Sequence, residues 1–331
     1  MPRSAIAVCV NQTGRARSGR RRRFLGVGVA MLGLPVILWV GAATFIANQI
    51  KYPIFLSSAR GDDVVGEHVP ERTSHPYDLA RSSIGVMPDE FKAGQVEFAG
   101  LPVDVSGLYF HGRRSDTIIL LAAAGGGTES LIPYAQFLYA AGYSVLALDS
   151  LSNAHLGTDF GWTDSAAVLK AAAKLRHDGV GRIAVMGISE GGAAAIFAAA
   201  EKPMFSAVIA DSSYANLDEM LRQNPSIAGL NPAFAATVLG IAEHRWFPRP
   251  FTEIAPADAA LKLRCPLLVI QNEADPLTPV ANGRAIEDAA RKSGNRAQLW
   301  VAPAQGHGNA IFEISDQYKK QVLDFLAANM S

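Results

Sequence analysis

The serine of a G-x-S-x-G pattern is the most distinctive candidate for chemistry in this chain. The pattern Gly187-Ile188-Ser189-Glu190-Gly191 follows the apolar run 182–187 and opens the small-residue stretch 189–201. A serine between a buried strand and a helix predicts a nucleophile elbow, a sharp turn that exposes the hydroxyl. The alternative is a glycine-rich corner where helix and strand pack closely and Ser189 only caps the helix.

A serine hydroxyl becomes a nucleophile when a base takes its proton and a third group orients that base. His307 is the candidate base, because it lies in a glycine-flanked loop after the late apolar run 297–304. Asp275 is the candidate acid, because it follows the apolar run 266–271. Asp211, at the end of another apolar run, is the alternative acid.

The charge that develops on an attacked carbonyl oxygen needs two backbone N–H donors. The N–H of Glu190, at the start of the expected helix, is one candidate donor. The second should come from the glycine-rich loop 124–129 after the apolar run 117–124, and Gly126 is the chosen residue. The alternative is that this loop is flexible and offers no fixed amide.

Apolar runs alternate with helical patterns from about residue 95 to the last residues. Two alternating segments around a Gly-Leu-Pro turn predict an antiparallel hairpin within 95–112. Continuous apolar runs predict strands buried on both faces, at 117–124, 143–149, 182–187, 206–213, 266–271 and 297–304. Helical patterns lie between and after these runs, at about 131–141, 163–179, 189–201, 282–294 and 315–329. The alternation predicts an α/β fold, with a mostly parallel sheet, helices on both faces and ligands at the carboxyl ends of the strands.

The N-terminal region has the composition of a membrane anchor. Residues 1–23 contain seven arginines and no acid, and residues 24–50 contain no charged side chain. A helix of that length is about 40 Å long, which is enough to cross a bilayer. The arginines predict a cytoplasmic tail and place the remaining chain on the periplasmic or extracellular side of a bacterial inner membrane. Cleavage as a signal peptide near residues 41–43, and a buried soluble helix, are the alternatives.

Composition excludes several classes of function. Residues 51–331 carry 23 basic and 30 acidic side chains, so no positive patch favours nucleic-acid binding. Cys9 and Cys265 show no metal-binding or redox spacing and are expected to be unpaired thiols. No phosphate-binding loop, metal site or organic cofactor is expected. The oligomeric state stays open.

Over about residues 88–331 the chain resembles the α/β-hydrolase superfamily. The motifs that carry the resemblance are GISEGG, ADSSYANLDEM, CPLLVIQNEADPLTP and GHGN, in this order. They look most like bacterial esterase and acyl-peptidase-like serine hydrolases with an N-terminal anchor. The resemblance implies a catalytic triad in the chain order Ser189, Asp275, His307.

Two residues depart from the superfamily's usual pattern. Members often have a His-Gly pair at the oxyanion loop, where this chain has Ala124-Gly125. Something other than that histidine must then hold the loop. Glu190 also places a carboxyl group next to the oxyanion site, where its negative charge would oppose catalysis unless the side chain points away.

The expected organisation is a basic tail (1–23), a transmembrane signal anchor (24–50), a stalk or N-terminal wrap (51–87) and an α/β-hydrolase domain (88–331). Residues 212–263 form a long insertion between two strands and resemble a lid. The insertion contains the aromatic residues Tyr214, Phe234, Trp246, Phe247 and Phe251. These side chains are interpreted either as walls of an acyl pocket or as the packing of the lid itself.

The sequence as a whole predicts a serine hydrolase that cleaves an acyl bond of a small-molecule substrate, with a carboxylic ester preferred. An amide or peptide hydrolase of the same fold is one alternative. A second alternative is a non-catalytic binding module with this fold, which is suggested by the altered oxyanion loop.

Overall fold

A single eight-stranded sheet forms the centre of the molecule. The computed structural model describes residues 36–50, 76–98, 100–152, 157–224, 229–247 and 249–330. The strands are β1 Asp89–Phe98, β2 Leu101–Phe110, β3 Thr117–Leu121, β4 Ser144–Leu148, β5 Ile183–Ile188, β6 Ala207–Asp211, β7 Leu267–Ala274 and β8 Ala297–Gln305. Their order across the sheet is β1-β2-β4-β3-β5-β6-β7-β8. The hairpin β1–β2 joins β4 in antiparallel pairing, and every pairing from β4 to β8 is parallel.

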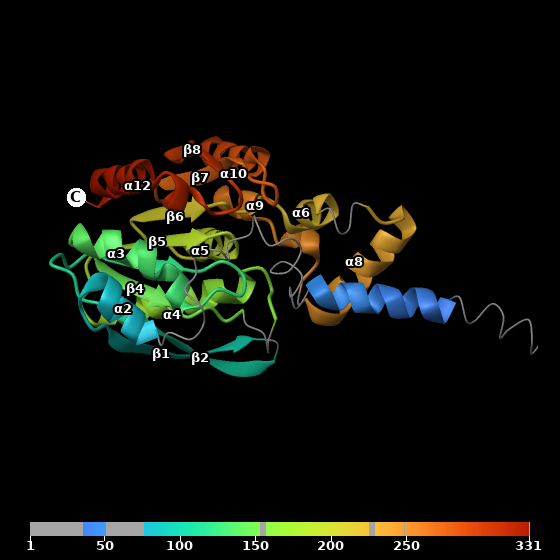
Figure 1. Cartoon of the computed structure of the whole chain (residues 1–331), viewed down its shortest axis with the longest axis horizontal. Coiled ribbons are helices and arrows are strands. Elements are labelled where there is room, and N and C mark those ends of the chain that lie inside the picture. Colours follow the sequence, from blue (N-terminus) through green and yellow to red (C-terminus); the bar gives the residue numbers. More distant parts are fainter. Residues whose placement is uncertain are drawn as a thin grey trace, which may run out of the picture.

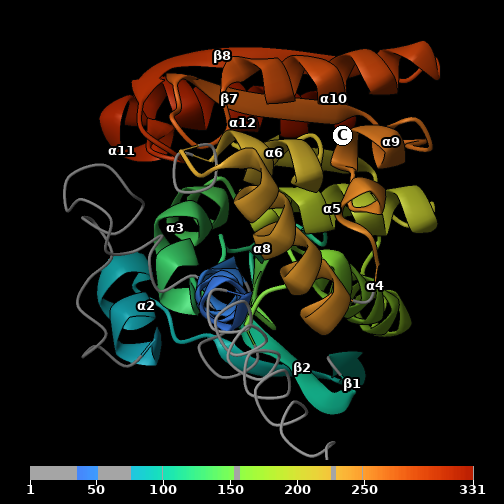
Figure 2. The ribbon, with the colours of Figure 1, turned by 90° about the vertical axis from the view of Figure 1, so that its right-hand side faces the viewer.

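Helices cover both faces of this sheet, as Figures 1 and 2 show. The helices with named bounds are α2 Pro76–Ile84, α3 Ile132–Ala140, α4 Trp162–His177, α5 Glu190–Glu201, α6 Leu217–Gln223, α8 Pro232–Trp246, α9 Pro256–Ala260, α10 Val280–Lys292, α11 Ala310–Glu313 and α12 Ser315–Asn329. Another helix spans residues 36–50.

Alternate side chains of the strands supply two separate cores. Val185 of β5 packs with α4, α5, α9 and α10 on one face. Its neighbour Met186 packs with α2, α3, α11 and α12 on the other face. All residues of β3, β4, β5 and β6 are buried, which explains why these strands are continuous apolar runs in the sequence.

The segment between β6 and β7 forms a cap made of α6 and α8 and ends in a short helix, α9, that packs on the main body against α5 and α10. A third apolar cluster joins α6 and α8 to helix 36–50. In Figure 1 helix 36–50 lies beside α8, and both project from the same side of the sheet. The five aromatic residues of this segment belong to that cluster, two of them only partly buried, so their own packing accounts for most of their burial.

The expected strands and helices are present, with shifts at their ends. β3 ends at Leu121 and not at residue 124, so the alanines that follow it belong to the loop. Leu101 and Pro102 lie in β2, so the hairpin turn comes before them. Helix α2 was not expected; it lies within the segment interpreted as a stalk or wrap and packs against α3 through the buried Ala80.

The N-terminal predictions fall mostly outside the described residues. Residues 1–35, with the basic tail, Cys9 and the first part of the expected anchor, and residues 51–75 are not described. Among the residues that the structure does describe, no helix is both long enough and apolar enough to cross a membrane. Cys265 is buried and unpaired, and burial raises the pKa of its thiol to about 11.

Candidate active site

Ser189 occupies a strained turn between the end of β5 and the start of α5. Its φ is 56° and its ψ is −115°, a region that L-residues rarely adopt. A Cβ added to Gly187 would lie 2.0 Å from the carbonyl oxygen of Gly191, and one added to Gly191 would lie 2.6 Å from the carbonyl oxygen of Ala122. Only glycine permits this close approach of helix to strand, so the glycines of the motif are required by geometry.

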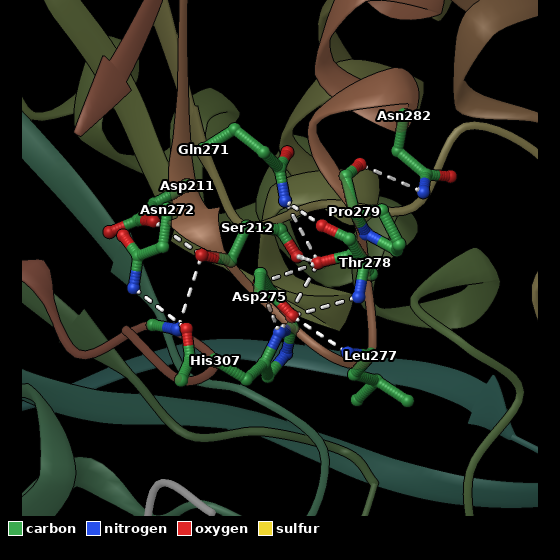
Figure 3. Close-up of polar contacts among 12 residues, drawn as sticks. Asp211, Ser212, Gln271, Asn272, Asp275, Leu277, Thr278, Pro279, Asn282 and His307 are labelled. Carbon is green, nitrogen blue, oxygen red and sulfur yellow. Dashed lines mark hydrogen bonds and ion pairs between the residues drawn. The ribbon is translucent and has the colours of Figure 1, made fainter. Parts of the chain in front are cut away.

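His307 and Asp275 meet at the carboxyl ends of the last two strands (Figure 3). Asp275 follows β7, His307 follows β8, and the His307 Nδ1 lies 2.8 Å from Asp275 Oδ2. Both side chains are almost fully buried. This hydrogen bond directs the proton to Nδ1 and leaves Nε2 as the ring's basic atom. Nε2 is buried and has no hydrogen-bond partner in the described part of the chain, so no bond to Ser189 is made in this conformation.

Thr278 and Asn272 hold this pair in place, and neither was singled out from the sequence. The Thr278 hydroxyl lies 2.9 Å from Asp275 Oδ2 and 3.2 Å from His307 Nδ1 (Figure 3). Asp275 Oδ1 accepts hydrogen bonds from the amides of Leu277 and Thr278. The Asn272 amide donates to the carbonyl of Gly306, which fixes the loop of His307. The Asp-x-x-Thr spacing of an Asx-type turn was the available signal for Thr278.

Asp211, the alternative acid, has other partners. Its carboxylate accepts a hydrogen bond from the Tyr318 hydroxyl at 2.6 Å and another from Ser212 Oγ at 2.9 Å. Burial raises the pKa of Asp211 to about 6, although both hydrogen bonds act in the opposite direction. Between the two candidate acids, Asp275 is therefore the one in contact with His307.

The glycine-rich loop after β3 is held by its own turn and by a serine. The N–H of Gly126 donates to the carbonyl of Ala123 at 2.9 Å, and the Ser130 hydroxyl donates to the carbonyl of Gly127 at 2.7 Å. In this conformation the Gly126 amide serves the turn, so it is not available to an oxyanion as the sequence had suggested.

The C-terminal 60% of the chain matches a known family. Residues 134–331, which include Ser189, Asp275 and His307, match the model of the prolyl oligopeptidase family. The chain belongs to this family. Its members and the sheet order described above place it in the α/β-hydrolase superfamily, among esterase- and acyl-peptidase-like serine hydrolases. No curated protein matches the chain.

Solved structures show the same fold at low sequence identity. An esterase of Pyrococcus furiosus is 22% identical, with a TM-score of 0.62, and the match covers 82% of this chain and 100% of that one. An acylaminoacyl peptidase of Pyrococcus horikoshii is 17% identical, with a TM-score of 0.58, and the match covers 73% and 41%. A puromycin-hydrolyzing peptidase of Mycobacterium tuberculosis is 17% identical, with a TM-score of 0.58, and the match covers 75% of this chain and 40% of that one. The chain thus spans the whole of the esterase but about two fifths of each peptidase.

The side chain of Glu190 points away from the nucleophile into a buried polar pocket. Its Oε1 accepts hydrogen bonds from the hydroxyls of Ser152 and Thr158 and from the amide of Gly161. The residue is 3% exposed. This arrangement answers the concern raised by the sequence, because Oε1 is bonded to Ser152, Thr158 and Gly161 while the amide stays at the start of α5. Oε2 is buried and has no hydrogen-bond partner among the described residues.

Three buried carboxyl groups gather in this pocket. Asp159, Asp164 and Glu190 each offer an oxygen within 4.8 Å of the others, the one such group among the described residues that could hold a cation. Burial, followed by repulsion from neighbouring carboxylates, raises the pKa of Glu190 to about 8 and that of Asp164 to about 7. At neutral pH the Glu190–Asp164 pair therefore retains a proton, which reduces the buried charge without a metal.

Replacement of Glu190 by glutamine should change how stability depends on pH. The pKa of Glu190 rises from 4.5 to about 8 on folding, so between these values the unfolded chain releases a proton that the folded chain keeps. The free energy of unfolding of the unmodified protein should therefore fall as pH rises from 5 to 8, by an amount on the order of 2 kcal/mol. Glu190→Gln keeps an oxygen acceptor and should lose the part of this slope that Glu190 contributes, so that thermal unfolding shows only the part due to Asp164 and Asp211.

Glu201→Gln, an exposed change at the other end of α5, is the matched control and should follow the unmodified protein. Parallel pH profiles for the unmodified protein and Glu190→Gln would contradict the raised pKa.

Proposed function

We propose that this chain hydrolyses carboxylic esters through Ser189, His307 and Asp275. The observation that carries the proposal is the buried Asp275–His307 pair at the same sheet edge as the strained Ser189. Within the described ranges, Nε2 of His307 has no hydrogen-bond partner and is left to act as a base. Catalytic hydrogen bonds are often unformed without substrate, so a side-chain rotation of Ser189 towards Nε2 is the step expected on binding.

The reaction follows from these positions. His307 Nε2 takes the Ser189 proton as Oγ bonds to the acyl carbon, and the resulting imidazolium is stabilised by Asp275. The C–O bond to the alcohol then breaks, and His307 gives its proton to the leaving oxygen. A water oxygen then bonds to the acyl carbon while its proton goes to Nε2. The bond between that carbon and Ser189 Oγ breaks, the carboxylic acid leaves, and Oγ takes the proton back from Nε2.

Two backbone amides are expected to bind the oxyanion. Glu190 supplies one from the first turn of α5, where the helix dipole also favours negative charge. Because the Gly126 amide serves a turn, the second donor is assigned to an earlier residue of the same loop, Ala123 or Ala124. The close contact of Gly191 with the Ala122 carbonyl brings this part of the loop next to the elbow.

An ester is preferred to a peptide as substrate because the chain matches the full length of an esterase but only part of a peptidase. The match to the Pyrococcus furiosus esterase covers all of that protein, whereas the acylaminoacyl peptidase has a further part that this chain does not match. The peptide alternative is favoured by the family itself, which is named for a peptidase.

We also propose that residues 24–50 anchor the chain in a bacterial inner membrane, with the hydrolase on the periplasmic or extracellular side. The support is the uncharged 27-residue segment and the seven arginines before it. An alkaline phosphatase fusion after Ile50 should be active and a fusion to a cytoplasmic reporter at the same position inactive. The reverse result would contradict the orientation.

A fluorophosphonate probe tests the nucleophile. The probe should label the purified protein at one serine, and Ser189→Ala should abolish both the labelling and the hydrolysis of p-nitrophenyl butyrate. Ser213→Ala, a buried serine near the same edge of the sheet, is the control and should still be labelled. Absence of labelling in the unmodified protein would favour the non-catalytic binding module.

Paired asparagine variants test the acid. Asp275→Asn should lower kcat by about 10⁴-fold, because the His307 tautomer is no longer fixed. Asp211→Asn should change kcat less than about tenfold, since Asp211 bonds to Tyr318 and not to His307. A larger loss in Asp211→Asn, with both variants folded by circular dichroism, would mean that the acid is assigned wrongly.

A further inference from the structure

The largest exposed apolar surface of the described residues lies on helix 36–50. Nine large hydrophobic side chains are exposed in the described residues, and six of them belong to this helix: Val36, Ile37, Leu38, Trp39, Val40 and Phe45. Exposures of 42% to 68% in one contiguous helix are costly in water, because a monomeric protein rarely leaves such a patch uncovered. Something must therefore cover this helix in the working protein.

Helix 36–50 is fastened to the lid helix α8. The Trp39 and Phe234 rings make an edge-to-face contact with centroids 4.8 Å apart, and the Trp39 indole N–H donates to the Thr237 hydroxyl at 3.4 Å. Ala43 and Ala47, four residues apart and fully buried, share one apolar cluster with residues of α8. Small side chains on one face allow close helix packing, so the two helices form one unit, named here the helix pair.

Charge is distributed unevenly along the helix pair. Helix 36–50 has no charged residue, and α8 has none from Pro232 to Ala242. The charges of α8 are all in its last turn, where Glu243, His244 and Arg245 lie. In Figure 1 the uncharged start of helix 36–50 is the end farthest from the sheet, and α8 runs beside it. The helix pair therefore presents an apolar outer part and a polar base.

The chain that precedes helix 36–50 indicates what covers this surface. Residues 24–35 are also uncharged, and they lead back to the arginines of residues 15–23. The apolar surface and the apolar segment that precedes it suit the hydrocarbon core of a bilayer. The cationic cluster before them suits anionic lipid headgroups. A protein partner would be expected to pair with charged groups at the edge of the patch, and among the described residues the outer part of the helix pair carries none.

The same apolar cluster reaches the candidate active site. Ala193 and Phe197 of α5, the helix that begins after Ser189, belong to it together with Phe160 and Tyr214. The Tyr214 hydroxyl donates to the Phe160 carbonyl at 2.6 Å, which ties the start of the lid to the loop before α4. The apolar cluster therefore connects the helix pair to the helix that begins after Ser189.

We infer that helix 36–50 and α8 together dock on an anionic lipid bilayer, and that the enzyme takes its ester from this bilayer as an amphiphile with a long acyl chain. The docking half stands on the helix pair and on the uncharged and arginine-rich sequence that precedes it. The substrate half rests on the proposed ester hydrolysis, so the two are tested separately.

Spin labelling tests the docking. The full-length chain with Cys9→Ser, in which Cys265 remains buried, is labelled at Ala236→Cys on the exposed face of α8 or at Ala327→Cys on the exposed face of α12. In vesicles of phosphatidylcholine and phosphatidylglycerol (3:1), the label at 236 should be protected from an aqueous nickel reagent and accessible to oxygen. The label at 327 should show the reverse. Equal nickel accessibility at the two positions would overturn the docking, and protection at 236 without lipid, with a doubled mass in solution, would assign the surface to a second copy of the chain.

Hydrolysis tests the substrate class. The variant Ala233→Glu/Ala236→Glu puts charges on the outer part of α8, and Ala327→Glu/Ala328→Glu puts the same charges on α12. With p-nitrophenyl palmitate in the same vesicles the α8 variant should lose at least tenfold in kcat/KM, while dissolved p-nitrophenyl butyrate should be cleaved within twofold of the unmodified rate. The α12 variant should match the unmodified protein on both esters.

Equal activity of the α8 variant on vesicle-borne ester would overturn the substrate half, and so would an equal loss on both esters. If the unmodified protein cleaves neither ester, the proposed ester hydrolysis fails together with the substrate half, and the spin-label result still decides the docking.

Discussion

The close approach of α5 to β5 is the constraint on which the rest of the site depends. With the Gly191 carbonyl so near the Cα of Gly187, the chain must reverse direction at a single residue, and Ser189 takes the strained conformation that this requires. The turn places the hydroxyl beyond the carboxyl end of a central strand and the first amides of α5 beside it. The loops after β3, β7 and β8 then need only end at the same edge of a parallel sheet to reach it, and parallel pairing ensures that they do.

Burial of Glu190 shows how an acidic residue can stand next to a nucleophile. Its Oε1 accepts hydrogen bonds from the described part of the loop before α4, namely Ser152, Thr158 and Gly161. The neighbouring Asp164 accepts a hydrogen bond from the Leu151 amide. Desolvation raises the pKa values of Glu190 and Asp164 and so favours protonation of the pair. The negative charge near the oxyanion site is therefore smaller than two ionised carboxylates would give. The arrangement costs stability at higher pH, and it ties the conformation of this loop to the elbow.

The sheet and most of its helices were predictable because strands buried on both faces are recognisable as uninterrupted apolar runs, for example 183–188. The ends were less predictable: the alanines after Leu121 are apolar but belong to a loop, since no neighbouring strand pairs with them. Ser189, Asp275 and His307 were selectable because each follows a strand. Asn272 was not, since its hydrogen bond to Gly306 joins two loops that are distant in the sequence. Thr278 was overlooked, although its spacing from Asp275 offered a signal. The direction of the Gly126 amide depends on a turn that composition does not define.

The hydrogen bond between Tyr318 and Asp211 has a consequence for the order in which the molecule is completed. Asp211 lies on a central strand, but the hydroxyl that satisfies it comes from α12, more than a hundred residues later and after His307. During synthesis β5, β6 and the elbow leave the ribosome long before this helix exists. Until α12 docks, Oδ2 of Asp211 lacks its partner and only Oδ1 is bonded, to the hydroxyl of Ser212. That hydroxyl also accepts a hydrogen bond from the Gly308 amide next to His307. A chain that stops before Ser315 would therefore contain every proposed catalytic residue yet lack the Tyr318–Asp211 hydrogen bond at the end of β6.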